Sequence, residues 1–217
     1  EPPRGYESRL RRVGNHLELI HGNAHTCIFD TAGRTAAIRD ESGNTLTVTR
    51  NAACYPQRVV ASNGSALTLT VDATGRVTEV RDDGGRRWRY GYDGDGRLET
   101  VIGPTFPGNP TGLRQRYTYA VAGGDPRRAA AIATMVDAGG DTILRNRYGT
   151  TGDETNRIVE QFSGTDRWQF EFARPGRNLA PTPANRQCVA SRTTVVDPAG
   201  SRIENDFNPQ GAMVAQR

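Results

Sequence analysis

The sequence predicts an all-β protein made of antiparallel β-hairpins that follow one another along the chain. Three observations predict this fold class. An Asp-x-x-Gly tetrad recurs at regular intervals, the side chains between tetrads alternate between apolar and polar, and the 217 residues include 25 glycines and 12 prolines. Alternation with a period of two is typical of a strand with one buried face. Abundant glycine and proline indicate many turns, so the sequence argues against a helical bundle.

The tetrads set the order of the hairpins. Seven of them begin with aspartate, and an eighth, Asn208–Gly211, begins with asparagine. The seven are Asp30–Gly33, Asp40–Gly43, Asp72–Gly75, Asp82–Gly85, Asp93–Gly96, Asp137–Gly140 and Asp197–Gly200. Neighbouring tetrads start 10 or 11 residues apart in four cases. The intervals from Asp30 to Asp72, from Asp93 to Asp137 and from Asp137 to Asp197 are 42, 44 and 60 residues, which are near multiples of about 21. We infer a repeating unit of two turns and two strands.

Each tetrad has the composition of a tight chain reversal. An aspartate at the first position of a type I turn accepts hydrogen bonds from the backbone ahead of it. A glycine at the fourth position adopts the positive φ that closes a hairpin with a bulge. Arginine follows this glycine four times, at Arg34, Arg76, Arg86 and Arg97. We therefore expect the aspartates and glycines of the tetrads to have structural roles.

The alternation is clearest in four segments, residues 67–71, 88–92, 117–121 and 168–172. Their apolar and aromatic members are Leu67, Leu69, Val71, Trp88, Tyr90, Tyr92, Tyr117, Tyr119, Val121, Trp168, Phe170 and Phe172. We expect these side chains to form the core. Residues 129–136 are also expected to be a strand. Val77 and Val80 are separated by an odd offset, as are Leu98 and Val101, which predicts a β-bulge or burial on both faces.

Two proline-containing stretches interrupt the repeat. Residues 103–112 and residues 173–187 contain prolines that exclude a central strand, so both are predicted to be loops. Because the repeat resumes after each loop, neither is expected to link separate domains. We expect lead-in strands over residues 1–28 and one hairpin-repeat domain over residues 29–217.

The repeats resemble the YD-repeat or Rhs family over roughly residues 29 to 214. The motif that carries the resemblance is an aromatic residue followed by Asp-x-x-Gly-Arg-Leu, found here at residues 92–98, with related copies at residues 196–202 and 207–211. The family includes bacterial Rhs and wall-associated polymorphic toxins, the B/C components of Tc insecticidal toxins and the barrel of animal teneurins. The resemblance implies hairpins that curve into part of a spiral β-barrel or shell.

The resemblance also implies a function. In the toxins the shell encloses a C-terminal toxic domain until delivery, which implies a structural module that encloses or presents a toxin or other polypeptide cargo. The expected partners are this cargo and further repeats of a longer parent chain. The parent protein is expected to be bacterial and to be secreted or displayed on the cell surface. The chain is shorter than a closed shell requires. We therefore expect it to be an N-terminal or middle portion of a longer repeat array.

The alternative function is a cell-surface recognition module that binds carbohydrate or a protein receptor through the two loops or outward-facing aromatic residues. No enzymatic activity and no cofactor are expected. The family's self-cleavage site has an Asp-Pro-x-Gly sequence similar to residues 197–200, but here the flanking residues have the pattern of one more repeat. Each aspartate has a sufficient role in its turn, which weakens an interpretation of the aspartates as paired catalytic carboxylates.

Composition argues against two further classes. The 28 basic residues are all arginine and are balanced by 24 acidic ones. They are dispersed along the chain, whereas a nucleic-acid-binding protein gathers its basic residues on one face. Mean hydropathy is −0.65, and no run approaches the roughly 18 apolar residues of a membrane-spanning helix. The three cysteines, Cys27, Cys54 and Cys188, are too few and too irregularly spaced for a disulfide framework.

One cluster of residues suggests a metal site. All three histidines, His16, His21 and His25, lie in one short segment, and Cys27 follows two residues later. A hairpin at residues 21–25 would place two imidazoles across its neck, and His16 or Cys27 could complete a set of zinc ligands. The alternative is a polar hairpin with a cross-strand histidine pair. The same residues could suggest a cysteine nucleophile with a histidine base, but no supporting motif accompanies them.

Overall fold

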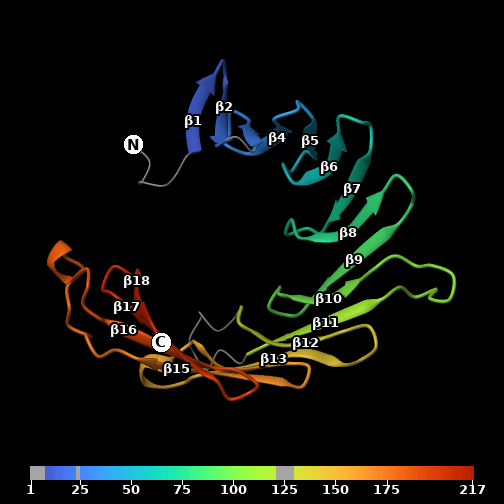
Figure 1. Ribbon diagram of the computed structural model, residues 1–217. Helices are drawn as coiled ribbons and strands as arrows, with labels where there is room; N and C mark the ends of the chain where they lie inside the picture. The colour runs from blue at the N-terminus through green and yellow to red at the C-terminus, as the bar shows by residue number, and fades with distance from the viewer. Residues whose placement is uncertain (1–7, 23–24, 121–129) are drawn as a thin grey trace. The chain divides into compact units, whose positions relative to one another are not determined.

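The computed structural model describes residues 8–22, 25–120 and 130–217, and within these ranges the protein is all-β (Figure 1). The described residues contain eighteen strands, no α-helix, and two single-turn 3₁₀ helices, η2 (Gly152–Glu154) and η3 (Pro183–Asn185). The predicted fold class of serial antiparallel hairpins is therefore confirmed. Among these residues, no helix is long and apolar enough to cross a membrane.

The chain forms two compact units. The first comprises Glu1–Gly91 and Val101–Leu113, and the second comprises Tyr92–Thr100 and Arg114–Arg217. The division passes through strand β10 (Leu98–Ile102) and places Tyr92, the last residue of the strand Arg87–Tyr92, in the second unit. Loop residues 103–112 belong to the first unit, where Phe106 and Asn109 form an isolated antiparallel bridge.

In the first unit each strand pairs antiparallel with the strand before it, from β1 to β9. The strands are β1 (Ser8–Val13), β2 (His16–His21), β3 (His25–Phe29), β4 (Thr35–Asp40), β5 (Thr45–Arg50), β6 (Pro56–Ala61), β7 (Ala66–Val71), β8 (Val77–Asp82) and β9 (Arg87–Tyr92). The first two lie within the expected lead-in segment, and β3 extends one residue past it.

The second unit continues the same pattern from β11 to β18. Its strands are β11 (Arg114–Tyr119), β12 (Ile132–Val136), β13 (Thr142–Tyr148), β14 (Ile158–Ser163), β15 (Asp166–Ala173), β16 (Ser191–Val196), β17 (Arg202–Phe207) and β18 (Met213–Gln216). The expected strand over 129–136 is present as β12. Residue 129 and Val121, both included in the expected strands, lie outside the described residues.

A bulge lies in β8, as the offset between its valines predicted. Thr70 faces Glu79 and Val71 faces Val77, so Thr78 is an extra residue with no partner in the register. Val80 faces Leu69. Because Leu69 and Val71 share a face, the extra residue also places Val77 and Val80 on one face. Equivalent register shifts occur after other turns, for example between β3 and β4 and between β17 and β18.

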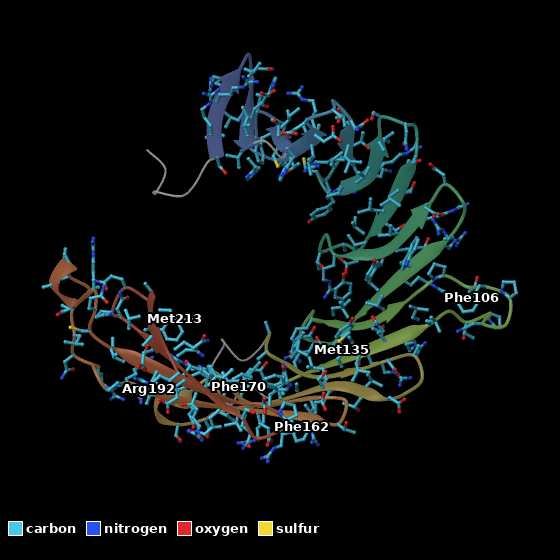
Figure 2. The ribbon with its side chains drawn as sticks, in the orientation of Figure 1. Phe106, Met135, Phe162, Phe170, Arg192 and Met213 are labelled. Carbon is cyan, nitrogen blue, oxygen red and sulfur yellow. The ribbon has the colours of Figure 1, made fainter. Side chains whose placement is uncertain are left out.

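The strands are half-buried on one face. Trp88, Phe170 and Phe172 have intermediate exposure, whereas their neighbours Arg89 and Glu171 are exposed. Among the described apolar residues only Ala66 and Val159 are almost fully buried, at 5 % and 6 % exposure. The apolar faces are thus only partly covered within the chain. The register also places Phe162 on the opposite face of the second unit from Phe170, both labelled in Figure 2.

Candidate functional site

The most repeated local structure is the turn around each tetrad, and Asp30 illustrates its geometry. Its Oδ1 accepts the backbone N–H groups of Ala32 and Arg34, both at 2.9 Å. Its Oδ2 accepts Nε–H of the Arg34 side chain at 2.9 Å. The Gly33 N–H donates to the Asp30 carbonyl at 3.0 Å, and Gly33 has a φ of +77°. One carboxylate therefore fixes the turn and the arginine that follows it.

The other Asp-Arg tetrads repeat this arrangement. The carboxylates of Asp72, Asp82 and Asp93 accept Nε–H of the arginine four residues later at 2.8, 2.6 and 2.7 Å. Where no arginine follows, the backbone pattern persists, because Asp40, Asp137, Asp197 and Asn208 each accept the N–H of the residue four positions on. The glycines Gly43, Gly75, Gly85, Gly96, Gly140, Gly200 and Gly211 all have positive φ.

These contacts favour the ionised form of the turn aspartates Asp30 and Asp72. The backbone N–H of Arg34 and then its guanidinium lower the pKa of Asp30 below its ordinary value. The hydroxyl of Thr74 and then the groups of Arg76 lower the pKa of Asp72 in the same direction. A general acid needs a raised pKa, so Asp30 and Asp72 have the electrostatics of structural hydrogen-bond acceptors.

The structure contains a turn that the tetrad pattern did not include. Residues 51–54 have the sequence Asn-Ala-Ala-Cys, and the Asn51 N–H donates to the Tyr55 carbonyl at 2.9 Å. The Asn51 side-chain oxygen also accepts the Tyr55 N–H at 2.9 Å. Cys54 takes the place of glycine with a φ of +67°. The interval between the tetrads at Asp40 and Asp72 would have indicated a turn here.

Arginines also lie over the aromatic residues of the strands. Within the second unit, the guanidinium carbons of Arg97, Arg145 and Arg157 lie 4.8, 4.2 and 4.7 Å from the ring centroids of Tyr119, Phe162 and Phe172 respectively. The Tyr119 hydroxyl donates to the Leu98 carbonyl at 2.7 Å. An arginine over an aromatic face is attracted to the ring by a cation–π interaction. These arginines therefore contribute to packing between neighbouring parts of the second unit.

Buried carboxylates on the strands were missed by sequence reasoning. Glu18 on β2 is 4 % exposed and accepts Nε–H of Arg11 at 2.8 Å. Asp206 on β17 is 1 % exposed and accepts Nε–H of Arg192 at 2.6 Å as well as a hydrogen bond from Arg217. The Arg192 contact, followed by the charge of Arg217, lowers the pKa of Asp206. Arg11 and Arg192 lie on the strands next to their carboxylates, so only the register identifies these pairs.

An apolar groove of about 620 Å³ lies on the half-buried face of the first unit. Strands β5 to β9 line it with Leu46, Val59, Ala66, Leu67 and Trp88. Leu46 and Leu67 are 44 % and 40 % exposed. The groove therefore presents apolar surface that the rest of the described chain does not cover.

Three of the four candidate metal ligands come together. His21, His25 and Cys27 have ligand atoms within 4.8 Å of one another. The rings of His21 and His25 stack with their centroids 4.6 Å apart. His16 does not join them, because it lies five residues before His21 and so faces the other side of β2, where its Nε2 is 3.4 Å from Glu18.

The comparisons with known proteins identify the repeat. Residues 71–105 match the family described as RHS Repeat, so the predicted resemblance is confirmed for the segment that includes Asp72, Asp82 and Asp93. Curated proteins yield no match to the chain.

Several solved structures are similar to the chain in structure at low sequence identity. The "Crystal Structure of TcdB2-TccC3" has 10 % identity and a TM-score of 0.45 over 96 % of this chain and 13 % of that one. The Photorhabdus luminescens Tc holotoxin pore has 12 % identity and a TM-score of 0.35 over 89 % of this chain and 13 % of that one. A porin-like protein from Bacteroides uniformis has 10 % identity and a TM-score of 0.37 over 99 % of this chain and 90 % of that one. The chain spans only about an eighth of the Tc-toxin chains.

Proposed function

We propose that this chain, which carries an RHS repeat at residues 71–105, is a structural repeat module in the shell of a longer exported protein, where it encloses or presents a toxin or other polypeptide. The observation that carries the proposal is the recurrence of one self-contained turn between strands whose apolar faces are only half-buried. A hairpin with such a face gains stability when neighbouring hairpins and a further polypeptide cover it.

The groove on the first unit supports polypeptide contact. It exposes Leu46 and Leu67 beside Trp88, and burial of such surface contributes about 25 cal/mol per Å² of apolar area. An incompletely folded chain exposes apolar side chains that can provide this burial. The proposed partners are accordingly the further repeats of the parent chain and its polypeptide cargo, and the proposed location is the cell surface or the exterior.

The turns support a structural role over a catalytic one. Arg34 and Arg76 occupy one oxygen of the Asp30 and Asp72 carboxylates, and backbone N–H groups occupy the other. A carboxylate used in this way is a poor proton donor. We assign no reaction to the turn aspartates.

Binding of a non-native polypeptide tests the proposal. The 217-residue chain is mixed with a reduced and carboxymethylated protein, which cannot fold, and Trp88 fluorescence is followed in a Trp168→Phe background. We expect saturable binding that weakens at least tenfold in a Leu46→Gln, Leu67→Gln variant. Thr47→Gln with Thr68→Gln is the matched control, because these exposed neighbours lie on the other face of β5 and β7, and it should bind normally.

Two results would overturn the proposal. If the Leu46→Gln, Leu67→Gln variant binds the polypeptide as tightly as the unmodified 217-residue chain does, the groove is not where the polypeptide binds. Absence of polypeptide binding, together with saturable binding on a glycan array that Trp88→Ala abolishes, would favour the alternative of a carbohydrate-recognition module.

A further inference from the structure

A polar row crosses the first four strands near one end of the sheet. In the register Ser8 faces His21, His21 faces His25, and His25 faces Asp40. Residues directly opposite one another share a face of the sheet, so all four side chains lie on the same side. Cys27 is two residues beyond His25 on β3 and therefore shares that side as well.

We propose that His21, His25 and Cys27 bind a zinc ion. Two imidazole nitrogens and one thiolate are a ligand set that zinc accepts. The candidate ligand atoms of all three residues lie within 4.8 Å of one another. In a tetrahedral zinc site, ligand atoms are separated by roughly 3.3–3.8 Å. Side-chain rotations that draw the atoms together by about 1 Å would therefore complete the site, and the paired strands hold the backbone in place.

A hydrogen bond to Ser8 prepares His21 for this role. The Ser8 hydroxyl lies 3.1 Å from Nδ1 of His21. When Nδ1–H donates to this hydroxyl, the lone pair of the neutral imidazole is on Nε2, where it can bind a metal. Metal-binding histidines generally donate their other ring N–H to such a partner, which fixes the tautomer and the ring orientation. Ser8 therefore acts as a positioning residue.

The row also indicates what fills the fourth position. Asp40 faces His25, but both of its carboxylate oxygens accept hydrogen bonds from Asn44, each at 2.8 Å. A cavity of about 240 Å³ adjoins His25 and Asp40, which leaves space for a water molecule. We infer three protein ligands and one water. Cys27 would bind as the thiolate, so its S–H proton would be released on zinc binding.

Cobalt substitution tests the ligand set directly. The full chain is freed of metal with a chelator and titrated with Co²⁺, which occupies zinc sites and has visible absorption bands. We expect binding of one Co²⁺ per chain, a near-ultraviolet charge-transfer band from the Cys27 thiolate, and displacement of Co²⁺ by one equivalent of Zn²⁺.

Two variants at proposed ligands and one control variant test the assignment. Cys27→Ser should remove the charge-transfer band, and Cys27→Ser and His25→Gln should each weaken Zn²⁺ binding at least tenfold. His16→Gln is the matched control, because His16 is on the opposite face of β2, and it should bind Zn²⁺ normally. Circular dichroism and the melting temperature without metal establish that each variant is folded.

Labelling of thiols provides a second measurement in which His21, His25 and Cys27 are all left unchanged. In a Cys54→Ser, Cys188→Ser background, Zn²⁺ should slow alkylation of Cys27 at least tenfold. Absence of stoichiometric Zn²⁺ binding, Co²⁺ binding without the thiolate band, unchanged alkylation, or equal loss of affinity in His16→Gln would each overturn the proposal.

Discussion

At the scale of the residue, four of the tetrad turns join an aspartate at the first position to an arginine four positions later. Asp30 and Asp72 precede Arg34 and Arg76, whose guanidinium groups need a carboxylate. Asn208 precedes Ala212, and its amide oxygen accepts only backbone N–H groups. Aspartate therefore adds an ion pair where arginine follows, whereas asparagine suffices for the turn itself.

The first prediction concerns pH. Because folding lowers the pKa of Asp72 and Asp30, the unfolded chain binds more protons in the acid range, and stability increases with pH there. The contribution of these turns is complete above the ordinary aspartate pKa of about 4 and is lost as the pH falls through the folded-state values. Urea unfolding between about pH 6 and pH 2 should show this decline.

Asp72→Asn should reduce the slope of stability against pH and lower stability at neutral pH, because asparagine keeps the backbone contacts but loses the ion pair with Arg76. Asp166→Asn is the control, since exposed Asp166 is not the first residue of a tetrad. If both variants have the slope of the parent chain, the ionised turns do not account for the acid sensitivity.

The second prediction compares two glycines with similar backbone conformations. Gly43 and Gly75 have φ values of +84° and +86°. A Cβ at Gly43 meets nothing within 4 Å, whereas at Gly75 it collides with the Tyr55 ring. Gly43→Ala should cost about 1–2 kcal/mol for the left-handed conformation, and Gly75→Ala about 1–3 kcal/mol more for the collision.

Urea unfolding measures this difference, and a double substitution assigns its cause. Tyr55→Ala removes the ring, so in that background Gly75→Ala should cost no more than Gly43→Ala. An extra cost of Gly75→Ala that persists without the ring would show that the collision is not its source.

At the scale of the element, the sequence predicted the strands, whose side chains alternate, and the turns, whose tetrads repeat. The strands and the bulge near Val77 follow from the period of the side chains, and the turns follow from the tetrads. The register between strands could not be predicted, because the tetrads do not show which pairings contain a bulge: the pairing of β7 with β8 shifts by one residue, whereas the pairings of β1 with β2 and of β16 with β17 do not. Glu18 and Asp206 were missed for this reason, since Arg11 and Arg192 reach them only through a particular alignment.

The candidate metal ligands were also predictable from the sequence only in part. The sequence indicated that His21, His25 and Cys27 are close along the chain, and a hairpin between the histidines makes them neighbours in space. It left His16 as an alternative because the strand bounds were not known. Once β2 is known to include both His16 and His21, their odd separation places them on opposite faces.

The third prediction compares two ion pairs on the strands. Arg192 contacts Asp206, whose side chain is 1 % exposed, whereas Arg202 contacts Glu171, whose side chain is 58 % exposed. Solvent screens an exposed pair, so it contributes little to stability, whereas the buried carboxylate of Asp206 loses one of its two arginine partners when Arg192 is replaced.

Thermal unfolding of two double-mutant cycles measures the coupling in each pair. Arg192→Gln with Asp206→Asn should show clear coupling and a lower melting temperature for each single variant. Arg202→Gln with Glu171→Gln should show almost none. Equal coupling in the two cycles would mean that burial of Asp206 does not strengthen its contact with Arg192.

At the scale of the whole molecule, the two compact units each contain one tryptophan, Trp88 in the first and Trp168 in the second. In a chain of repeats each unit gains stability mainly from its immediate neighbours. A substitution in one unit is therefore expected to act most strongly on that unit.

The fourth prediction uses these tryptophans as separate reporters. With Trp168→Phe, fluorescence reports the first unit, and with Trp88→Phe it reports the second. Gly75→Ala should lower the urea midpoint seen by Trp88 and leave that seen by Trp168 nearly unchanged. Coincident midpoints that shift together would show that the molecule unfolds as one cooperative unit.

The closure of each turn has an evolutionary consequence. All the hydrogen bonds around Asp30 that fix its turn, including the one to the arginine side chain, join residues within the five positions 30–34. A tandem duplication or deletion of one hairpin would carry its complete set of donors and acceptors with it. A repeat array can therefore lengthen or shorten without loss of the hydrogen bonds that close its turns.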